Sequence, residues 1–169
     1  MTVPTHFSPD VGTVPGLEIW RIENFAPVPY KKELYGTFYS GDAYIVLSTV
    51  KKGSKLKWDI HFWLGENAPQ DEIGTAALIA VELDNLLGGV PVQHREVQGY
   101  ESSLFSPYFA AGIRYLDGGV ASGFKKISDD VYEKKLLQIK GKRNVRVVQV
   151  PMQISSMNKG DCFVLDTIS

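Results

Sequence analysis

In this chain of 169 residues, the segment Ser40-Gly41-Asp42-Ala43-Tyr44-Ile45-Val46-Leu47 carries the clearest structural signal. A glycine and a carboxylate followed by a run of β-forming residues predict a turn that leads into a strand. Residues 43–49 are apolar on both faces, which is typical of a central strand covered on both sides. We therefore expect the Asp42 side chain at the mouth of a buried strand.

The same pattern returns near the end of the chain as Lys159-Gly160-Asp161-Cys162-Phe163-Val164-Leu165-Asp166. In both copies a Val-Pro pair precedes the Gly-Asp pair, at Val28-Pro29 and at Val150-Pro151. Recurrence at a domain-sized separation is typical of tandem modules. The sequence predicts a flexible leader over 1–15, one complete module over 16–127, and a linker with the truncated start of a second module over 128–169.

Composition excludes several classes of protein. Hydrophobic residues make up 44% of the chain and charged residues 22%, as in an ordinary soluble globular protein. The net charge of −1 favours neither nucleic acid nor an anionic membrane, so an electrostatic partner needs a local patch. No apolar run approaches membrane-spanning length, so we expect no transmembrane segment. The single cysteine, Cys162, excludes an intrachain disulfide and a cysteine-built zinc site.

The remaining pattern predicts an α+β fold. Strands are expected over 17–22, 58–64, 92–98, 120–124, 135–140 and 145–150. The clearest helix runs over 70–87, with Pro69 at its entrance, two acids in its first turn and Gly88-Gly89 at its end. A shorter helix is expected over 101–109. We predict a mixed sheet with the long helix against it and the short helix elsewhere.

The long helix is apolar around most of its circumference. Ile73, Ala77, Ala80 and Leu87 form one stripe at helical spacing and are the predicted core face. Leu78, Ile79 and Val81 lie outside that stripe. Two interpretations fit: the helix is buried on two sides, or one face is a docking surface, a common mode of recognition.

Catalytic motifs are absent, and the sequence predicts a protein that is not an enzyme. The three histidines, His6, His61 and His94, are scattered and are interpreted as surface or hydrogen-bonded structural residues. Asp42, Glu72 and the glycine-rich turns at 88–89 and 118–119 offer the mixture of carboxylate and carbonyl oxygens that calcium prefers. Helix capping and solvation account for the same acids, so spacing alone leaves a calcium site open.

Six segments together resemble the first repeat of the gelsolin, villin, severin and fragmin family: 15–22, 40–44, 59–65, 70–77, 92–102 and 118–124. The resemblance runs from about residue 15 to 126 and resumes over 136–166 as the start of a second repeat. It implies a central mixed sheet between one long and one short helix, followed by an incomplete second module.

The resemblance also implies a function. It predicts a calcium-regulated, actin-binding module of the cytoplasm and cytoskeleton that binds actin monomers, caps filament barbed ends and is part of a filament-severing protein. The long helix would enter the cleft at the barbed end of actin, and the residues on the actin side would be Leu78, Val81, Glu82 and Asn85.

Two calcium sites follow from the same resemblance. The internal site would use the side chains of Asp42 and Glu72 with the carbonyls of Gly41 and Val120. A second calcium, shared with actin, would use Asp84 with the carbonyls of Gly89 and Pro91.

A basic stretch matches one of the phosphoinositide-binding segments of the family, and it comprises Lys134, Lys135, Lys140, Lys142, Arg143 and Arg146. Clusters of this kind are typical of anionic-lipid sites. A solvated strand edge explains them equally well. The alternative function is therefore a phosphoinositide- or calcium-binding adaptor that keeps the gelsolin fold and has lost actin binding.

Overall fold

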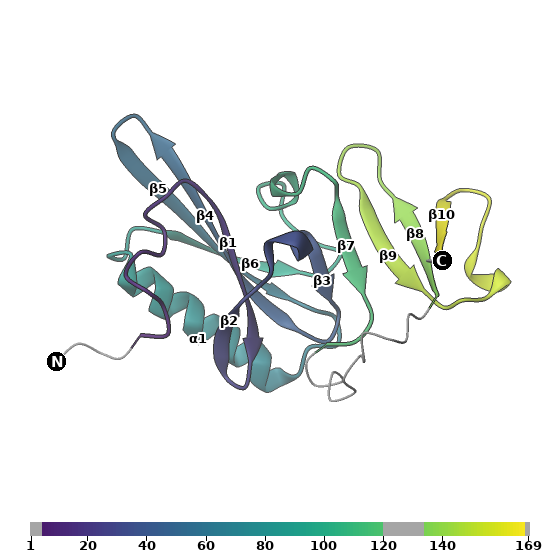
Figure 1. The fold of residues 1–169 in the computed structure, drawn as a ribbon, viewed down its shortest axis with the longest axis horizontal. Coiled ribbons are helices and arrows are strands. Elements are labelled where there is room, and N and C mark those ends of the chain that lie inside the picture. Colours follow the sequence, from purple (N-terminus) through teal and green to yellow (C-terminus); the bar gives the residue numbers. More distant parts are fainter. Residues whose placement is uncertain (1–4, 120–133, 168–169) are drawn as a thin grey trace.

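The computed structural model describes residues 5–119 and 134–167. Within them the chain forms one α-helix and two five-stranded sheets (Figure 1). The first sheet has the order β2-β1-β4-β5-β6, with bounds β1 Gly16–Glu23, β2 Ala26–Pro29, β4 Ala43–Lys52, β5 Lys55–Leu64 and β6 Val92–Val97. The second has the order β10-β8-β9-β7-β3, with bounds β3 Thr37–Tyr39, β7 Ile113–Leu116, β8 Lys135–Lys140, β9 Arg146–Val150 and β10 Cys162–Asp166.

The first sheet is mixed, as the sequence predicts. Strand β4 pairs antiparallel with β1 and β5, whereas β6 joins β5 in parallel after the helical crossover. In the β4–β5 register Ala43 lies opposite Leu64. Asp42 therefore sits just before the first paired residue of the central strand, and its side chain is buried. The predicted position of Asp42 is confirmed.

The long helix α1 spans Gln70–Leu86 and lies along one face of the first sheet (Figure 1). Pro69 is its N-cap residue, and Asp71 and Glu72 occupy its first turn, where carboxylates suit the positive end of the helix dipole. At its other end Gly88 and Gly89 adopt φ values of 82° and 70°, which favour glycine. The structure confirms the predicted helix almost to the residue.

Strand β4 separates two hydrophobic cores. Ile45 and Leu47 pack in the core that lies under α1. Tyr44 and Val46 point to the opposite face and pack with Phe38 and other aromatic residues of the second core. This alternation confirms that β4 is covered on both sides, as its apolar sequence indicates.

The prediction of a second, short helix over 101–109 is wrong. Residues 101–109 contain only a single 3-10 turn, Ser106–Tyr108, because Pro107 lacks the N–H that would continue a hydrogen-bonded helix. The second face of the first sheet is covered instead by aromatic side chains of this region and by β3 and β7. The other 3-10 turns of the described residues are Lys32–Leu34 and Ile154–Ser156.

The leader also differs from the expectation of a loose segment. Phe7 and Val11 are buried in the core under α1, and the Phe7 ring packs edge-on against Trp20 with ring centroids 5.1 Å apart. The leader carries two well-spaced apolar anchors, which its proline content obscures at the level of sequence.

The strands predicted to open a second module form the far half of the second sheet. Strand β9 runs parallel to β7, and β8 and β10 follow in antiparallel order. Val164 and Leu165 of β10 are exposed. The strand predicted over 120–124 lies outside the described residues, and the module boundaries remain a prediction.

Within the described residues, no helix is both long enough and apolar enough to cross a membrane.

Candidate functional site

The outer face of α1 consists of Leu78, Val81 and Asn85, which are all exposed. The Leu78 side chain is 73% exposed and Val81 47%, although both are large and apolar. No described part of the chain buries this face, so the structure favours a docking surface over a helix buried on two sides.

The predicted core stripe of the helix is confirmed in part. Ala80 is buried in the core under α1, and Ile73 and Leu87 are partly buried and pack against that core. Ile79, expected outside the stripe, is buried as well, which corrects the prediction. The side chains that face the sheet follow the three- and four-residue spacing of one helical stripe, and they are Thr75, Ala76, Ile79, Ala80 and Leu83. Because alanines and leucines occur on several faces of the helix, their spacing does not identify which face is buried.

Glu82, the remaining predicted actin-side residue, is held by the leader. Its carboxylate accepts hydrogen bonds from the Thr5 hydroxyl at 2.9 Å and from the His6 backbone N–H at 2.5 Å, and its Oε2 lies 2.8 Å from His6 Nδ1. Burial raises the pKa of Glu82, but these hydrogen bonds outweigh burial and lower it. The sequence gives no signal for a contact across 76 residues.

Asp42 and Glu72, predicted to hold an internal calcium, lie close together at the start of the helix, where the charge of Asp42 acts on Glu72. Burial of the carboxyl, together with the charges of Asp42 and Asp71, raises the pKa of Glu72 to about 7. Glu72 Oε2 is buried without a hydrogen-bond partner among the described residues. Two close carboxylates, one with an unsatisfied oxygen, form an arrangement that a cation stabilises.

Backbone crowds the same place. The Gly41 N–H donates to the Gly118 carbonyl at 2.7 Å, and a Cβ at Gly41 would lie 2.6 Å from that oxygen. A Cβ at Gly119 would collide with Asp42 Oδ1. Only glycine permits this approach, which brings the main chain of residues 118 and 119 against the Asp42 carboxylate. Val120 lies outside the described residues.

This donor set fits a hard cation. No three His, Cys, Asp or Glu side chains gather as metal ligands in the described parts of the chain. A site built on Asp42 and Glu72 would therefore complete its ligands with main-chain carbonyl oxygens, which calcium accepts readily.

Arg21 is a residue of this site that sequence reasoning missed. Its Nη1 lies 3.7 Å from Asp42 Oδ2, while Glu23 binds it through Nη2 at 2.5 Å and Nε at 2.7 Å. In the β1–β4 register Arg21 lies opposite Tyr44, two residues from Asp42. Only this pairing, which a linear pattern does not reveal, could have found Arg21.

Asp84, predicted to hold a second calcium shared with actin, lies near the other end of the helix. Its Oδ2 accepts a hydrogen bond from Gln93 Nε2 at 2.9 Å, whereas Oδ1 is buried without a partner among the described residues. The Gly89 N–H donates to the Asp84 carbonyl at 2.9 Å, which holds the loop leading to Pro91 close to this acid. An orphaned carboxylate oxygen beside exposed backbone fits the predicted cation position. Gln93 carries no sequence signal for this role.

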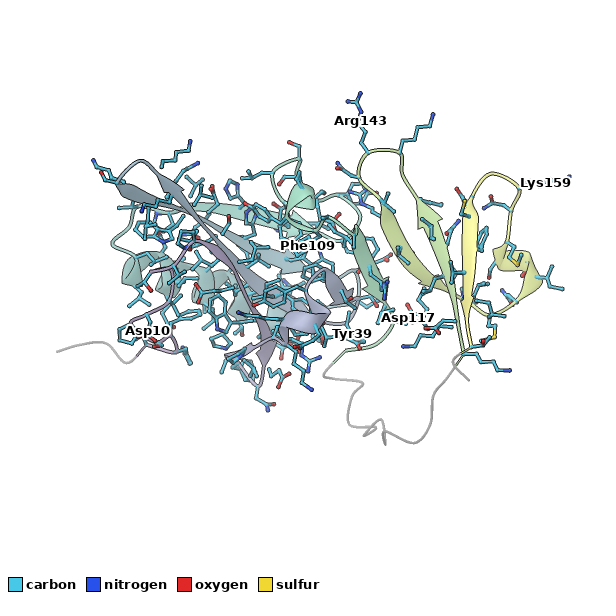
Figure 2. All side chains as sticks on the ribbon, turned by 45° about the horizontal axis from the view of Figure 1, so that its top comes forward. Asp10, Tyr39, Phe109, Asp117, Arg143 and Lys159 are labelled. Carbon is cyan, nitrogen blue, oxygen red and sulfur yellow. The ribbon has the colours of Figure 1, made fainter. Side chains whose placement is uncertain are left out.

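The six basic residues do not form one cluster. Arg146 is bound to the buried carboxylate of Glu101 at 3.1 Å, and Lys140 lies 3.8 Å from Asp161. Lys134 and Lys135 stand at the start of β8, a full strand away from the turn that carries Lys142 and Arg143. Figure 2 shows Arg143 extending from the tip of the β8–β9 hairpin.

The histidines are hydrogen-bonded structural residues, as predicted. His61 is fully buried, with Nδ1 2.8 Å from Glu96 Oε1 and Nε2 3.0 Å from the Tyr108 hydroxyl. His94 stacks on His61 with ring centroids 4.6 Å apart, and its Nε2 lies 2.9 Å from Asp59 Oδ1.

Comparison with known proteins identifies relatives of this chain. The family model of the gelsolin repeat matches residues 24–106. A cytoplasmic gelsolin of Homarus americanus is 60% identical over 156 residues, which cover 92% of this chain and 21% of the relative. The actin depolymerising venom protein gelsolin 1 of Platymeris rhadamanthus is 53% identical over 160 residues, covering 92% of this chain and 42% of the relative.

A solved structure shares the fold. A chain in the crystal structure of the Thorarchaeota 2DGel3/rabbit actin complex matches with a TM-score of 0.51 and 23% identity, over 89% of this chain and 71% of that chain. The chain spans less than half the length of the two curated relatives above, 21% of one and 42% of the other. High identity over nearly all of the present sequence establishes its kinship: the chain belongs to the gelsolin family.

Proposed function

We propose that this chain is a calcium-regulated actin-binding module that binds actin monomers and caps filament barbed ends, as part of a filament-severing protein. The observation that carries the proposal is the outer face of α1. This helix buries Ile79 and Leu83 in the core, yet it presents Leu78 and Val81 to solvent. An apolar helical face on an otherwise well-packed module suits insertion into a hydrophobic cleft of a partner.

The relatives support actin as that partner. One of them is described as an actin depolymerising protein, and the structural neighbour was solved in a complex with actin. Because the Homarus relative is a cytoplasmic gelsolin, we place the proposed function in the cytoplasm, at the actin cytoskeleton. The proposal gives the chain a binding role and no enzymatic activity.

Calcium enters the proposal through both ends of the helix. Asp42 and Glu72, with the carbonyls of Gly41 and Val120, would hold an internal calcium, which supplies the positive charge that two close carboxylates require. Asp84, with the carbonyls of Gly89 and Pro91, would hold a second calcium completed by an actin carboxylate. A cation held half by each protein binds only the complex, so linkage makes it strengthen association.

The phosphoinositide-binding adaptor remains the alternative function. Of its six basic residues, Arg146 and Lys140 are already paired with acids of the chain, which weakens the case for a single lipid site. Lys142 and Arg143 form an exposed pair at the β8–β9 turn, which an anionic headgroup could reach.

An actin assembly assay tests the proposal. We expect the chain to slow elongation of pyrene-labelled actin at barbed ends in calcium, with a weaker effect in chelator and little severing by the chain alone. Equal assembly with and without the chain, in both conditions, would refute the actin proposal and leave the adaptor.

A further inference from the structure

Arg21 places a fixed positive charge beside the internal site. Its guanidinium lies 3.7 Å from Asp42 Oδ2, and its charge also acts on Glu72. Asp42 is fully buried, whereas the Arg21 side chain is about a quarter exposed. Arg21 is therefore a monovalent cation built into the chain, next to the carboxylate that would bind a divalent one.

Glu23 fixes the position of this charge. Glu23 Oε1 lies 2.7 Å from Arg21 Nε and 2.5 Å from Arg21 Nη2. The third guanidinium nitrogen, Nη1, points to Asp42 but remains beyond hydrogen-bonding distance at 3.7 Å. The guanidinium is thus shared between two acids, close to Glu23 and less close to Asp42.

A cation bound at Asp42 meets two effects of Arg21. It encounters a like charge a few ångströms from its own ligand, and it takes over a carboxylate that Arg21 already partly neutralises. Both effects weaken binding of the cation, and both depend on the distance from Asp42 at which Glu23 holds the Arg21 guanidinium.

We propose that Arg21 is a positioning residue that lowers the affinity of the Asp42–Glu72 site for calcium, and that Glu23 tunes it by drawing its guanidinium away from Asp42. The inference rests on the internal calcium site of the proposed function and adds to it a device that sets affinity. The affinity of a calcium site is usually explained by its ligands, whereas here a neighbouring positive charge of the chain competes with the metal.

The two residues have opposite expected effects. Arg21→Gln removes the competing charge, and calcium should bind about tenfold more tightly, since a charge interaction over a few ångströms in partly buried surroundings changes an equilibrium by about this factor or more. Glu23→Gln releases Arg21 toward Asp42 and should weaken calcium binding about threefold or more. Arg21→Lys keeps the charge and should stay within about twofold to threefold of wild type.

A double variant separates the mechanism from simple loss of charge. If Glu23 acts through Arg21, then Glu23→Gln has little further effect in the Arg21→Gln background. Arg95→Gln, an exposed arginine on β6, makes the same change in net charge and serves as the control.

Isothermal titration calorimetry with calcium chloride on the full chain measures these affinities, in an Asp84→Ala background that leaves the internal site alone. Tighter binding by Arg21→Gln with an unchanged Arg95→Gln supports the inference. If wild type binds calcium and Arg21→Gln binds it equally or more weakly, the inference is overturned while the proposed function stands. Absence of calcium binding in wild type and all variants overturns the internal site and the inference with it.

Melting temperatures in chelator add a second measurement. Arg21→Gln should melt lower than wild type, because the calcium-free site loses the charge that offsets Asp42. A purely structural role predicts this loss of stability but no gain in calcium affinity. Should Arg21→Gln not fold, Glu23→Gln still decides, since affinity that stays unchanged or rises in that variant contradicts the inference.

Discussion

Leu78 and Ile79 are adjacent in sequence but lie on different faces of the long helix, one exposed and the other buried. The Leu78 side chain is 73% exposed, whereas Ile79 is 4% exposed and packs against the first sheet. One peptide step of about 100° around the helix separates a core residue from a residue that no described part of the chain covers. This division makes stability and binding separable by mutation.

Single aspartates at the two positions should differ sharply in stability. Ile79→Asp buries an unpaired charge and should cost more than about 4 kcal/mol of unfolding free energy, enough to unfold the chain. Leu78→Asp should stay within about 0.5 kcal/mol of wild type. Thermal melts followed by circular dichroism compare the two. A Leu78→Asp variant that melts as low as Ile79→Asp would mean that this face is buried after all.

Glu72→Gln should abolish the stabilisation that calcium gives through the internal site. Linkage predicts about 2.7 kcal/mol of added stability for wild type when calcium is a hundredfold above its dissociation constant. The amide keeps the shape of the side chain but removes a carboxylate ligand. Melting in calcium and in chelator, with Glu33→Gln as an exposed control, measures the difference. A calcium shift that survives in Glu72→Gln would remove Glu72 from the site.

The same variant should change the pH dependence of stability in chelator. Because the folded-state pKa of Glu72 is raised from 4.5 to about 7, its contribution is fully present below pH 4.5 and is lost as pH rises through 7. Burial lowers the pKa of His61, and that contribution has the opposite sign, so only the difference between variants isolates Glu72. Wild type and Glu72→Gln should be equally stable near pH 4.5, and Glu72→Gln should be the more stable at pH 8. Parallel pH curves would contradict the raised pKa.

Asp84→Ala should weaken binding to actin monomers more in calcium than in chelator. The loss should be about tenfold in calcium, because a shared cation would lose a ligand that only the complex completes. Fluorescence anisotropy with labelled actin provides the affinities, and Glu33→Ala controls for the lost charge. An equal loss in both conditions would assign Asp84 an ordinary contact role and exclude a bridging cation.

Phe7→Ala should destabilise the chain although Phe7 lies in the leader. Its ring is buried against Trp20, and truncation of a buried phenylalanine costs about 3–5 kcal/mol. Phe25→Ala removes the same atoms from an exposed position and should cost far less. Urea unfolding measures both. Equal urea midpoints for the two variants would contradict the docked leader and support the flexible leader that the sequence predicts.

Local patterns predict the elements that local physics determines. The run after Asp42 is long, apolar on both faces and preceded by a turn, so β4 follows from it directly. Pro69 and the Gly88-Gly89 pair bound α1 within a residue or two. The second sheet could not be predicted, because it depends on pairing between β7 and β9, which are separated by a long stretch of chain.

The candidate site divides in the same way. Asp42, Glu72 and Asp84 follow from the resemblance, and the structure adds the orphaned oxygens of Glu72 and Asp84 that suit cations. Arg21, Gln93 and the contact of His6 with Glu82 arise from strand register and chain docking, which no spacing encodes. The basic stretch misleads in the opposite direction, since neighbours in sequence lie at the two ends of a strand.

The affinity of actin monomers for the double variant Leu78→Asp/Val81→Asp, measured by anisotropy in calcium beside a melting curve, tests whether the outer face of α1 binds actin. The exposed Leu104→Asp variant, away from the helix, is the control. We predict that the double variant loses at least a hundredfold in affinity while its melting temperature stays within a few degrees of wild type. Undiminished affinity in a folded double variant would contradict the central claim that the outer face of α1 binds actin.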